Sequence, residues 1–196
     1  MTRDRLAGIL LAAGESTRLG EPKQLLDWRG RPLIEHTARV ALAAGLDPVV
    51  AVIGHRADEV RAALRAPVTI VENPNWQEGM STSLRAGLLA LPADVAAAIM
   101  LLVDQPLVDA KHLKAMIEAY RSSVHSIVVS TYQGDRGSPT LFDRSLFDEL
   151  QRVSGDSGGR TIVQAHPDLV TNVEADSELL LLDVDTPEDW QRLRRE

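Results

Sequence analysis

The stretch "GILLAAGESTRLGEPK" passes from an apolar run into Gly14, Ser16, Arg18, Gly20 and Lys23. Glycine lets backbone amides approach an anion closely, while Arg and Lys add forked and point-charge contacts. The spacing fits neither the Walker A loop nor the G-x-G-x-x-G dinucleotide motif. We therefore expect a phosphate-binding loop of another kind, and a turn with a solvated basic rim is the alternative.

Carboxylates follow two other apolar runs. Asp104 ends "LLVDQP", and Asp185 ends "LLLLDVD" directly before Thr186 and Pro187, which predict the start of a last helix. A carboxylate at the end of an apolar strand is costly unless it is paired or bound to a cation. Magnesium accepts few carboxylates together with phosphate oxygens and water. Asp104 and Asp185 are thus candidate metal ligands, and a turn or cap role explains Asp104 alone equally well.

Asp183 shares the face of Asp185 if "LLLLDVD" is a strand, because side chains two residues apart point to the same side. This geometry predicts a structural partner for the metal ligands. Asp185 lies nearer the end of the run, so it is the candidate metal ligand and Asp183 the candidate structural partner.

Three further stretches carry glycines and hydroxyls. "ENPNWQEGMSTSLRAGL" places Gly79, Ser81 and Ser83 at an expected helix start, where they either hold a nucleotide or cap the helix. Trp76 in this stretch favours packing over stacking. "GDRGSPTLF" and "GDSGGRTIV" are expected to be loops bordering the site, with plain surface loops as the alternative. The five histidines show no paired metal-ligand spacing.

Composition excludes several classes of function. The 196 residues carry a net charge of -7, which argues against a nucleic-acid binder that uses a basic surface. With no cysteine, disulfides, thiolate metal sites and cysteine nucleophiles are excluded. The apolar run after the N-terminal basic residues is short and leads into charge, and no segment reaches membrane-spanning length. We expect a cytoplasmic protein with no membrane and no nucleic-acid partner.

Short apolar runs alternate with helical patterns along most of the chain. The expected strands lie within 7–14, 48–55, 68–74, 97–106, 126–132 and 179–185, and the expected helices within 32–46, 57–66, 83–92 and 110–123. This order predicts an α/β fold with a doubly wound, mostly parallel mixed sheet in a three-layer, Rossmann-like arrangement. One domain is expected over 1–196. Ligands bind such sheets beyond the carboxyl ends of the strands.

Six motifs in order resemble the molybdenum-cofactor nucleotidyltransferases, and most closely their cytidylyltransferase branch. They are "LLAAGESTRLGEPKQLL", "NPNWQEGMSTSLRAGL", "VDQP", "RGSPTLF", "GDSGGR" and "VDTPEDW", and the likeness runs from Gly8 to Trp190. The resemblance implies a nucleotidyltransferase fold and transfer of a nucleoside monophosphate from a triphosphate to a phosphate acceptor such as molybdopterin cofactor. Pyrophosphate would leave, and a molybdoenzyme or its maturation chaperone would be a further partner.

The resemblance also implies roles for single residues. Ala12-Ala13 favours CTP over GTP, because the guanylyl branch carries a second glycine where Ala13 stands. Arg18, Lys23 and Asp104 would be catalytic, with Asp104 and Asp185 binding Mg2+. The nucleotide would be held by Leu11, Ala12, Ala13, Gly14, Ser16, Gly79, Ser81 and Ser83, and the acceptor by Gly137, Ser138, Pro139, Gly158, Gly159 and Arg160.

Three alternatives stay open at this point. The first keeps the chemistry but uses another triphosphate or another phosphorylated acceptor, such as a sugar phosphate. The second is a non-catalytic protein that binds or matures the molybdenum cofactor. The third, a nicotinamide oxidoreductase, lacks the dinucleotide motif.

Overall fold

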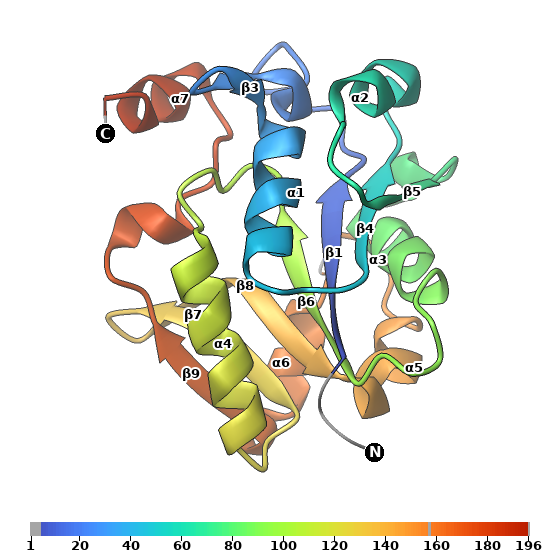
Figure 1. Cartoon of the computed structure of the whole chain (residues 1–196), viewed down its shortest axis with the longest axis vertical. Helices are drawn as coiled ribbons and strands as arrows, with labels where there is room; N and C mark the ends of the chain where they lie inside the picture. Colours follow the sequence, from blue (N-terminus) through green and yellow to red (C-terminus); the bar gives the residue numbers. More distant parts are fainter. Residues whose placement is uncertain (1–4, 157, 196) are drawn as a thin grey trace.

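A seven-stranded sheet runs through the molecule in the order β5-β4-β1-β6-β8-β7-β9 (Figure 1). The computed structural model describes residues 5–156 and 158–195. Only β8 runs antiparallel to its neighbours in this sheet, which confirms the mostly parallel mixed sheet. The strands are β1 (Leu6–Ala12), β4 (Val49–Ile53), β5 (Thr69–Glu72), β6 (Ala97–Leu102), β7 (Ile127–Tyr132), β8 (Asp135–Asp143) and β9 (Val170–Glu174), and a separate hairpin pairs β2 (Asp27–Trp28) with β3 (Arg31–Pro32).

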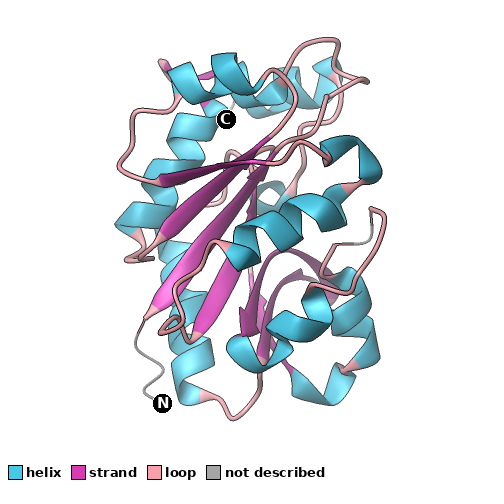
Figure 2. Ribbon diagram, turned by 90° about the vertical axis from the view of Figure 1, so that its right-hand side faces the viewer, coloured by secondary structure: helices cyan, strands magenta, loops and turns pink. Residues whose placement is uncertain are grey.

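Helices cover both faces of the sheet, and Figure 2 shows the strands between them. Strand β1 alternates between two cores: Leu10 packs with Leu33 and Leu113 on one face, and Ile9 packs with Leu84 on the other. The first core holds residues of α1 (Leu33–Ala43), α2 (Ala57–Ala63), α4 (Ala110–Ser122) and α7 (Pro187–Leu193), and the second holds residues of α3 (Met80–Leu89), α5 (Phe147–Leu150) and α6 (Arg160–Ala165).

The expected loop around Gly137 is instead the middle of strand β8. Ser138 and Pro139 fall at a register shift, because Thr140 pairs with Val129 while Gly137 pairs with Ser130. Proline lacks an N–H and is tolerated in a sheet at such a bulge. The glycine and proline that indicated a loop thus mark a bulge inside a strand. Strand β9 was also not expected.

The expected strand over 179–185 is wrong. Glu178–Leu181 form a 3-10 helix, η5, and the chain from 182 to 186 has no strand pairing. Leu180 is buried in the core on one face of the sheet, so the run of leucines reflects burial without indicating a strand. The prediction that Asp183 and Asp185 share one face of a strand is therefore also wrong.

The remaining short elements are 3-10 turns. They are η1 (Lys23–Leu25), η2 (Trp76–Glu78), η3 (Arg144–Leu146) and η4 (Pro167–Leu169). Over the described ranges, every helix is too short or too polar to cross a membrane.

His112 ties helix α4 to the sheet from inside the core. It is 6% exposed, and its Nε2 lies 2.8 Å from Ser130 Oγ, which donates to the carbonyl of Pro139. Burial lowers the pKa of His112, although the charges of Asp109 and Asp176 oppose the effect. The folded protein therefore binds fewer protons at this ring than the unfolded chain does.

We expect the free energy of unfolding to fall as pH drops through the ordinary histidine range around 6.5, because only the unfolded state then takes up the proton readily. His112→Gln should make the free energy of unfolding depend less on pH between pH 8 and pH 5.5, whether or not the substitution lowers stability at pH 8. Urea unfolding of both proteins at pH 8 and pH 5.5 measures the difference. An equal loss of stability in both would contradict the assignment.

Candidate active site

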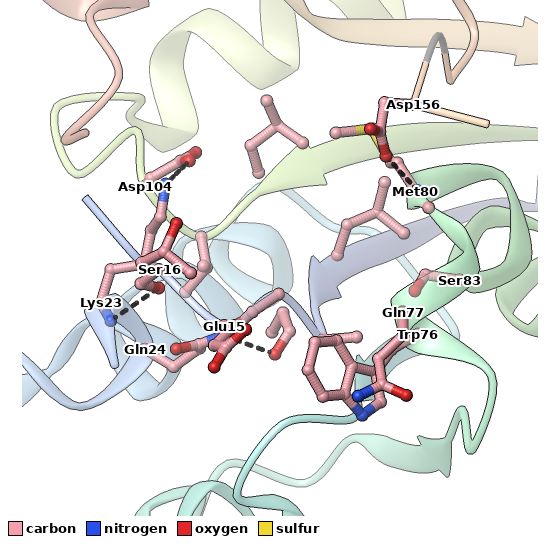
Figure 3. A pocket seen from close by; sticks show the side chains of 18 residues that line it. Glu15, Ser16, Lys23, Gln24, Trp76, Gln77, Met80, Ser83, Asp104 and Asp156 are labelled. Atoms are coloured by element: carbon pink, nitrogen blue, oxygen red, sulfur yellow. Dashed lines mark hydrogen bonds and ion pairs between the residues drawn. The ribbon is translucent and has the colours of Figure 1, made fainter. Parts of the chain in front are cut away.

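A cavity of about 430 Å³ opens at the carboxyl ends of β1 and β6 (Figure 3). The two strands are parallel neighbours with Leu11 opposite Leu102, so the segments that leave them lie side by side. Lys23 and Asp104 lie on one side of the cavity, and Trp76, Met80 and Ser83 on the other. Its lining is formed by Leu11, Ala12, Ala13, Gly14, Glu15, Ser16, Thr17, Lys23, Gln24, Trp76, Gln77, Gly79, Met80, Ser83, Leu102, Val103, Asp104 and Asp156.

The loop after β1 is folded back on itself by Gln24. This side chain is 1% exposed, and its Nε2 donates to the carbonyls of Ala12 and Gly14 at 2.9 and 2.8 Å. Ser16 has a φ of 62° and its Oγ accepts from the backbone amide of Lys23. A Cβ at Gly14 would meet no protein atom within 4 Å, so the space beside this glycine is open to a ligand.

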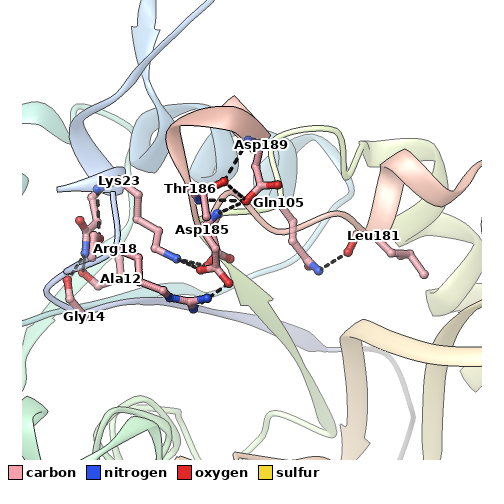
Figure 4. Close-up of polar contacts among 12 residues, drawn as sticks. Ala12, Gly14, Arg18, Lys23, Gln105, Leu181, Asp185, Thr186 and Asp189 are labelled. Carbon is pink, nitrogen blue, oxygen red and sulfur yellow. Dashed lines mark hydrogen bonds and ion pairs between the residues drawn. The ribbon is translucent and has the colours of Figure 1, made fainter. Parts of the chain in front are cut away.

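A cluster of opposite charges closes one side of the cavity (Figure 4). The ammonium of Lys23 lies 2.6 Å from Asp104 Oδ2 and 3.0 Å from Asp185 Oδ1, and Arg18 donates to Asp185 Oδ2 at 2.8 Å. The side chains of Lys23 and Asp104 are 15% and 16% exposed, whereas Arg18 is 69% exposed. Burial alone would lower the pKa of Lys23, but the two carboxylates outweigh it and the pKa is raised.

Asp185 is positioned by the start of helix α7. Thr186 caps this helix in a capping box with Asp189, and Asp189 Oδ2 also accepts from the backbone amide of Asp185. One residue earlier, the amide of Val184 donates to the carbonyl of Asp104 at 2.8 Å. The two carboxylate-bearing segments are therefore joined by the backbone, independently of their charges.

The carboxylate of Asp104 is only partly satisfied by its neighbours. Its Oδ1 is buried and has no hydrogen-bond partner among the described residues, while Oδ2 is held by Lys23. The loop that follows is fixed by His36 Nε2, which lies 2.9 Å from the carbonyl of Pro106. The described residues gather no group of three or more Asp, Glu, His or Cys side chains that would hold a metal on their own. A metal here needs oxygens from a substrate.

Asp183 adds a third carboxylate beside this cluster. Its side chain keeps solvent access, yet partial desolvation by neighbouring atoms, followed by the charge of Asp104, raises its pKa to about 6. A hydrogen bond from Gln105 opposes this increase. Desolvation is thus the larger cause of the raised pKa, and the negative charge of the neighbouring carboxylates adds to it.

The start of helix α3 forms the opposite wall. Its first residue follows Gly79, which has a φ of 109°, and neither Ser81 nor Ser83 caps the helix. Ser83 Oγ accepts from the amide of buried Asn73, and Ser81 is 2% exposed and does not line the cavity. Capping comes from another segment: the carbonyl of Gly155 accepts from the amide of Ser81, and Asp156 Oδ1 accepts from Met80.

Trp76 lines the cavity and also packs. A Cβ at Gly54 would lie 2.8 Å from atoms of the indole, and the ring meets His55 edge-on with centroids 5.2 Å apart. The indole therefore packs against Gly54 and His55 and also borders the cavity, so the preference for packing over stacking stays a prediction.

The six expected acceptor residues are not gathered in the cavity wall. Gly137 lies beside Leu181, and the carbonyl of Pro139 accepts from buried Ser130. Gly158 contacts Met80, which does line the cavity, and Gly159 packs against Phe142. Ser138 lies at the bulge of β8, Arg160 is exposed at the start of α6, and Ser157 of the "GDSGGR" motif lies outside the described residues.

Sequence reasoning missed the residues that support the loop and the wall. Gln24, Glu15, Thr17, Gln77 and Asp156 line the cavity, but no periodic or charge pattern distinguishes them. One signal was present: Gln24 directly follows Lys23 and is a polar residue among the apolar Leu25 and Leu26. Of the expected residues, Arg18 and Asp185 join the charge cluster without lining the cavity.

Comparison with known proteins identifies relatives of the whole chain. The chain is 36% identical to nicotine blue oxidoreductase of Paenarthrobacter nicotinovorans, over 96% of each chain. It superposes on Rv0371c of Mycobacterium tuberculosis with a TM-score of 0.88 and 33% identity over 100% of both chains, and that protein has also been solved in complex with manganese.

A nucleotidyl transferase from Methanothermobacter thermautotroptrophicus matches with a TM-score of 0.84 and 26% identity, covering 98% of this chain and 97% of its own. The model of the MobA-like NTP transferase domain matches residues 8–170, which include the cavity loop, helix α3 and Asp104. The chain therefore belongs to the MobA-like NTP transferase family.

Proposed function

We propose that this protein is a magnesium-dependent cytidylyltransferase that transfers CMP from CTP to the phosphate of molybdopterin cofactor and releases pyrophosphate. The observation that carries the proposal is the charge cluster at the cavity wall. Lys23 and Arg18 are held there by Asp104 and Asp185, beside a loop whose backbone borders open space at Gly14.

The reaction is an in-line displacement at the α-phosphorus. An oxygen of the acceptor phosphate forms a bond to that phosphorus, and the bond to the oxygen bridging to the β-phosphorus breaks with release of pyrophosphate. An acceptor phosphate is already ionised at neutral pH, so no general base is needed. The protein's task is to position the reactants and neutralise developing charge. Lys23 and Arg18 supply cations for the leaving group.

Asp104 and Asp185 would hold the magnesium ion. When bound, such an ion supplies positive charge and orientation to the phosphate oxygens. The unpartnered Oδ1 of Asp104 is the acceptor that this role requires. Two carboxylates and substrate oxygens suit magnesium, which keeps several water or phosphate ligands. The manganese complex of Rv0371c supports a divalent ion in this group of proteins.

CTP is favoured by the resemblance of Ala12-Ala13 to the cytidylyl branch. Both residues line the cavity, at 1% and 4% exposure, so a change of side chain at either position alters its shape. The acceptor would enter from the side of Met80 and Gly158, which are in contact.

An oxidoreductase is the second candidate. The relative from Paenarthrobacter nicotinovorans is named an oxidoreductase, and this chain matches it over nearly its full length. Neither the loop after β1 nor any other strand end carries the dinucleotide motif. Saturable NADPH binding in calorimetry, with no pyrophosphate formed under any condition, would favour this candidate. Tight binding of molybdenum cofactor with no pyrophosphate would favour a carrier.

The function is tested by supplying each of CTP, GTP, ATP and UTP with magnesium and either molybdopterin cofactor or a panel of sugar phosphates. We expect pyrophosphate only with CTP and the cofactor, since both sites must be filled for displacement. A coupled assay of pyrophosphate release measures it. Exclusive use of GTP would contradict the proposal that CTP is the donor. Turnover only with a sugar phosphate would show that the acceptor is a sugar phosphate and not molybdopterin cofactor.

Asp104→Asn should reduce turnover by about two to three orders of magnitude, the usual cost of removing a group that stabilises transition-state charge. Circular dichroism should show an intact fold. Asp94→Asn is the matched control, because Asp94 pairs with Arg5 at the amino ends of β1 and β6. Near-full activity of Asp104→Asn would disprove the metal assignment.

Lys23→Met leaves Asp104 and Asp185 without their shared cation. We expect the metal-free variant to lose roughly 1–3 kcal/mol of unfolding free energy, between the values of exposed and buried pairs. Magnesium should then raise its melting temperature more than that of the unchanged protein, because the ammonium no longer competes for the carboxylates.

The matched control for this experiment is Lys111→Met. Lys111 lies on α4, and the substitution breaks its exposed ion pair with Asp176. Thermal unfolding with and without millimolar magnesium provides the readout. Equal metal responses in all three proteins would place the ion elsewhere.

A further inference from the structure

A second cavity, of about 590 Å³, lies on the outer side of helix α1. It is bounded by the β2–β3 hairpin, α1, the end of α2 and Arg65, and it shares no lining residue with the nucleotide cavity. Helix α1 contacts both β3 and α2, and Figure 1 shows these elements together at the upper end of the molecule. None of the expected site residues lines it.

Glu35 gives this cavity a fixed base. It is 6% exposed, and its Oε2 accepts from the backbone amides of Arg65 and Ala66 at 2.8 and 2.9 Å. Its Oε1 accepts from Arg39 Nε at 2.5 Å. Burial alone would raise the pKa of Glu35, but these hydrogen bonds outweigh it and the pKa is lowered. The carboxylate therefore stays charged and clamps the chain after α2 to α1.

Three arginines line the cavity and have side-chain donors to spare. Arg31 and Arg65 make no side-chain hydrogen bond or ion pair with any residue in the described ranges. Arg39 uses only Nε, so both of its terminal nitrogens have no partner in the same ranges. Among the lining residues Glu35 is the one carboxylate. A chain of net charge -7 thus concentrates an excess of two positive charges here.

We propose that this cavity binds a phosphate or diphosphate group of a small molecule, at a site separate from the nucleotide cavity. Guanidinium groups match phosphate oxygens in forked hydrogen bonds, and they come here from three elements around one hollow. A phosphoryl group carries two or more charges on oxygens that point in different directions. Glu35, the carboxylate in the lining, balances only one of the three guanidinium charges, and a phosphoryl group can balance the other two.

The arrangement is partly preorganised, which favours binding of a compact ligand. Arg39 is already oriented by Glu35, and the backbone that carries Arg65 is fixed by the same carboxylate. Little ordering is then needed when an anion arrives. The inference rests on this cavity alone and does not depend on the proposed cytidylyl transfer.

The test is a titration of the 15N-labelled protein with sodium pyrophosphate, without divalent ions and at low ionic strength, followed by amide chemical shifts. We expect saturable shifts at Gly30, Arg31, Arg65 and Ala66. The double variant Arg31→Gln, Arg65→Gln should weaken this binding at least about tenfold, because two charge-assisted contacts are lost. The variant should fold, since Glu35 is bound by the backbone of Arg65 and not by its side chain.

Arg61→Gln is the matched control, because Arg61 lies on α2, whose end borders the cavity, but pairs with Glu72 and does not line the cavity. It should leave the dissociation constant unchanged. Replacing pyrophosphate by CDP identifies the source: equal affinity supports recognition of the phosphates alone, and tighter binding supports a nucleotide. Shifts confined to the loop between Gly14 and Lys23, or identical affinity in the double variant, would overturn the proposal. So would a response to polyglutamate but to neither phosphate compound.

Discussion

The ammonium of Lys23 between Asp104 and Asp185 is the interaction on which the site depends. Its partners are 81 and 162 residues away in the chain, so one cation joins three distant segments. Lys23 and Asp104 are mostly buried, and either charge alone would carry an uncompensated desolvation cost. The loop after β1, the end of β6 and the segment before α7 must therefore meet in one geometry. The cluster thus stabilises the meeting of these three segments and gathers charge at this end of the sheet.

Backbone hydrogen bonds make that geometry rigid without consuming the functional groups. Val184 donates to the carbonyl of Asp104, Asp189 receives the amide of Asp185, and Gln24 holds the carbonyls of Ala12 and Gly14. These supports act on main-chain atoms, so the carboxylates remain available to exchange one cation for another. Groups that are fixed by their surroundings lose little freedom on binding a ligand, which is the usual requirement of a preorganised site.

The sequence predicted the strands whose ends carry the site, because β1, β4 and β6 are buried on both faces and read as continuous apolar runs. The prediction failed where an apolar run or a turn residue has another cause. The run of leucines in η5 covers the core without forming a strand, and Gly137 and Pro139 mark a bulge inside β8 where they indicated a loop. Gln24 was missed because its one sequence signal, a polar residue before Leu25 and Leu26, does not indicate which carbonyls its amide binds. The roles of Gly159 and Ser83 depend on Phe142 and Asn73, contacts that only the folded chain defines.

Charge balance at the cavity wall bears on how a triphosphate is bound. The carboxylates of Asp104, Asp183 and Asp185 face the cations of Lys23 and Arg18, so the cluster holds one more negative charge than positive. The raised pKa of Asp183 has this excess as one of its causes. A free triphosphate would add several more negative charges and be repelled. Under the proposed function a triphosphate would therefore bind together with a neutralising divalent cation held by Asp104 and Asp185, and Lys23 would then be free to contact the phosphates. The same surplus of negative charge that raises the pKa of Lys23 would then favour a metal-bound substrate over a bare one.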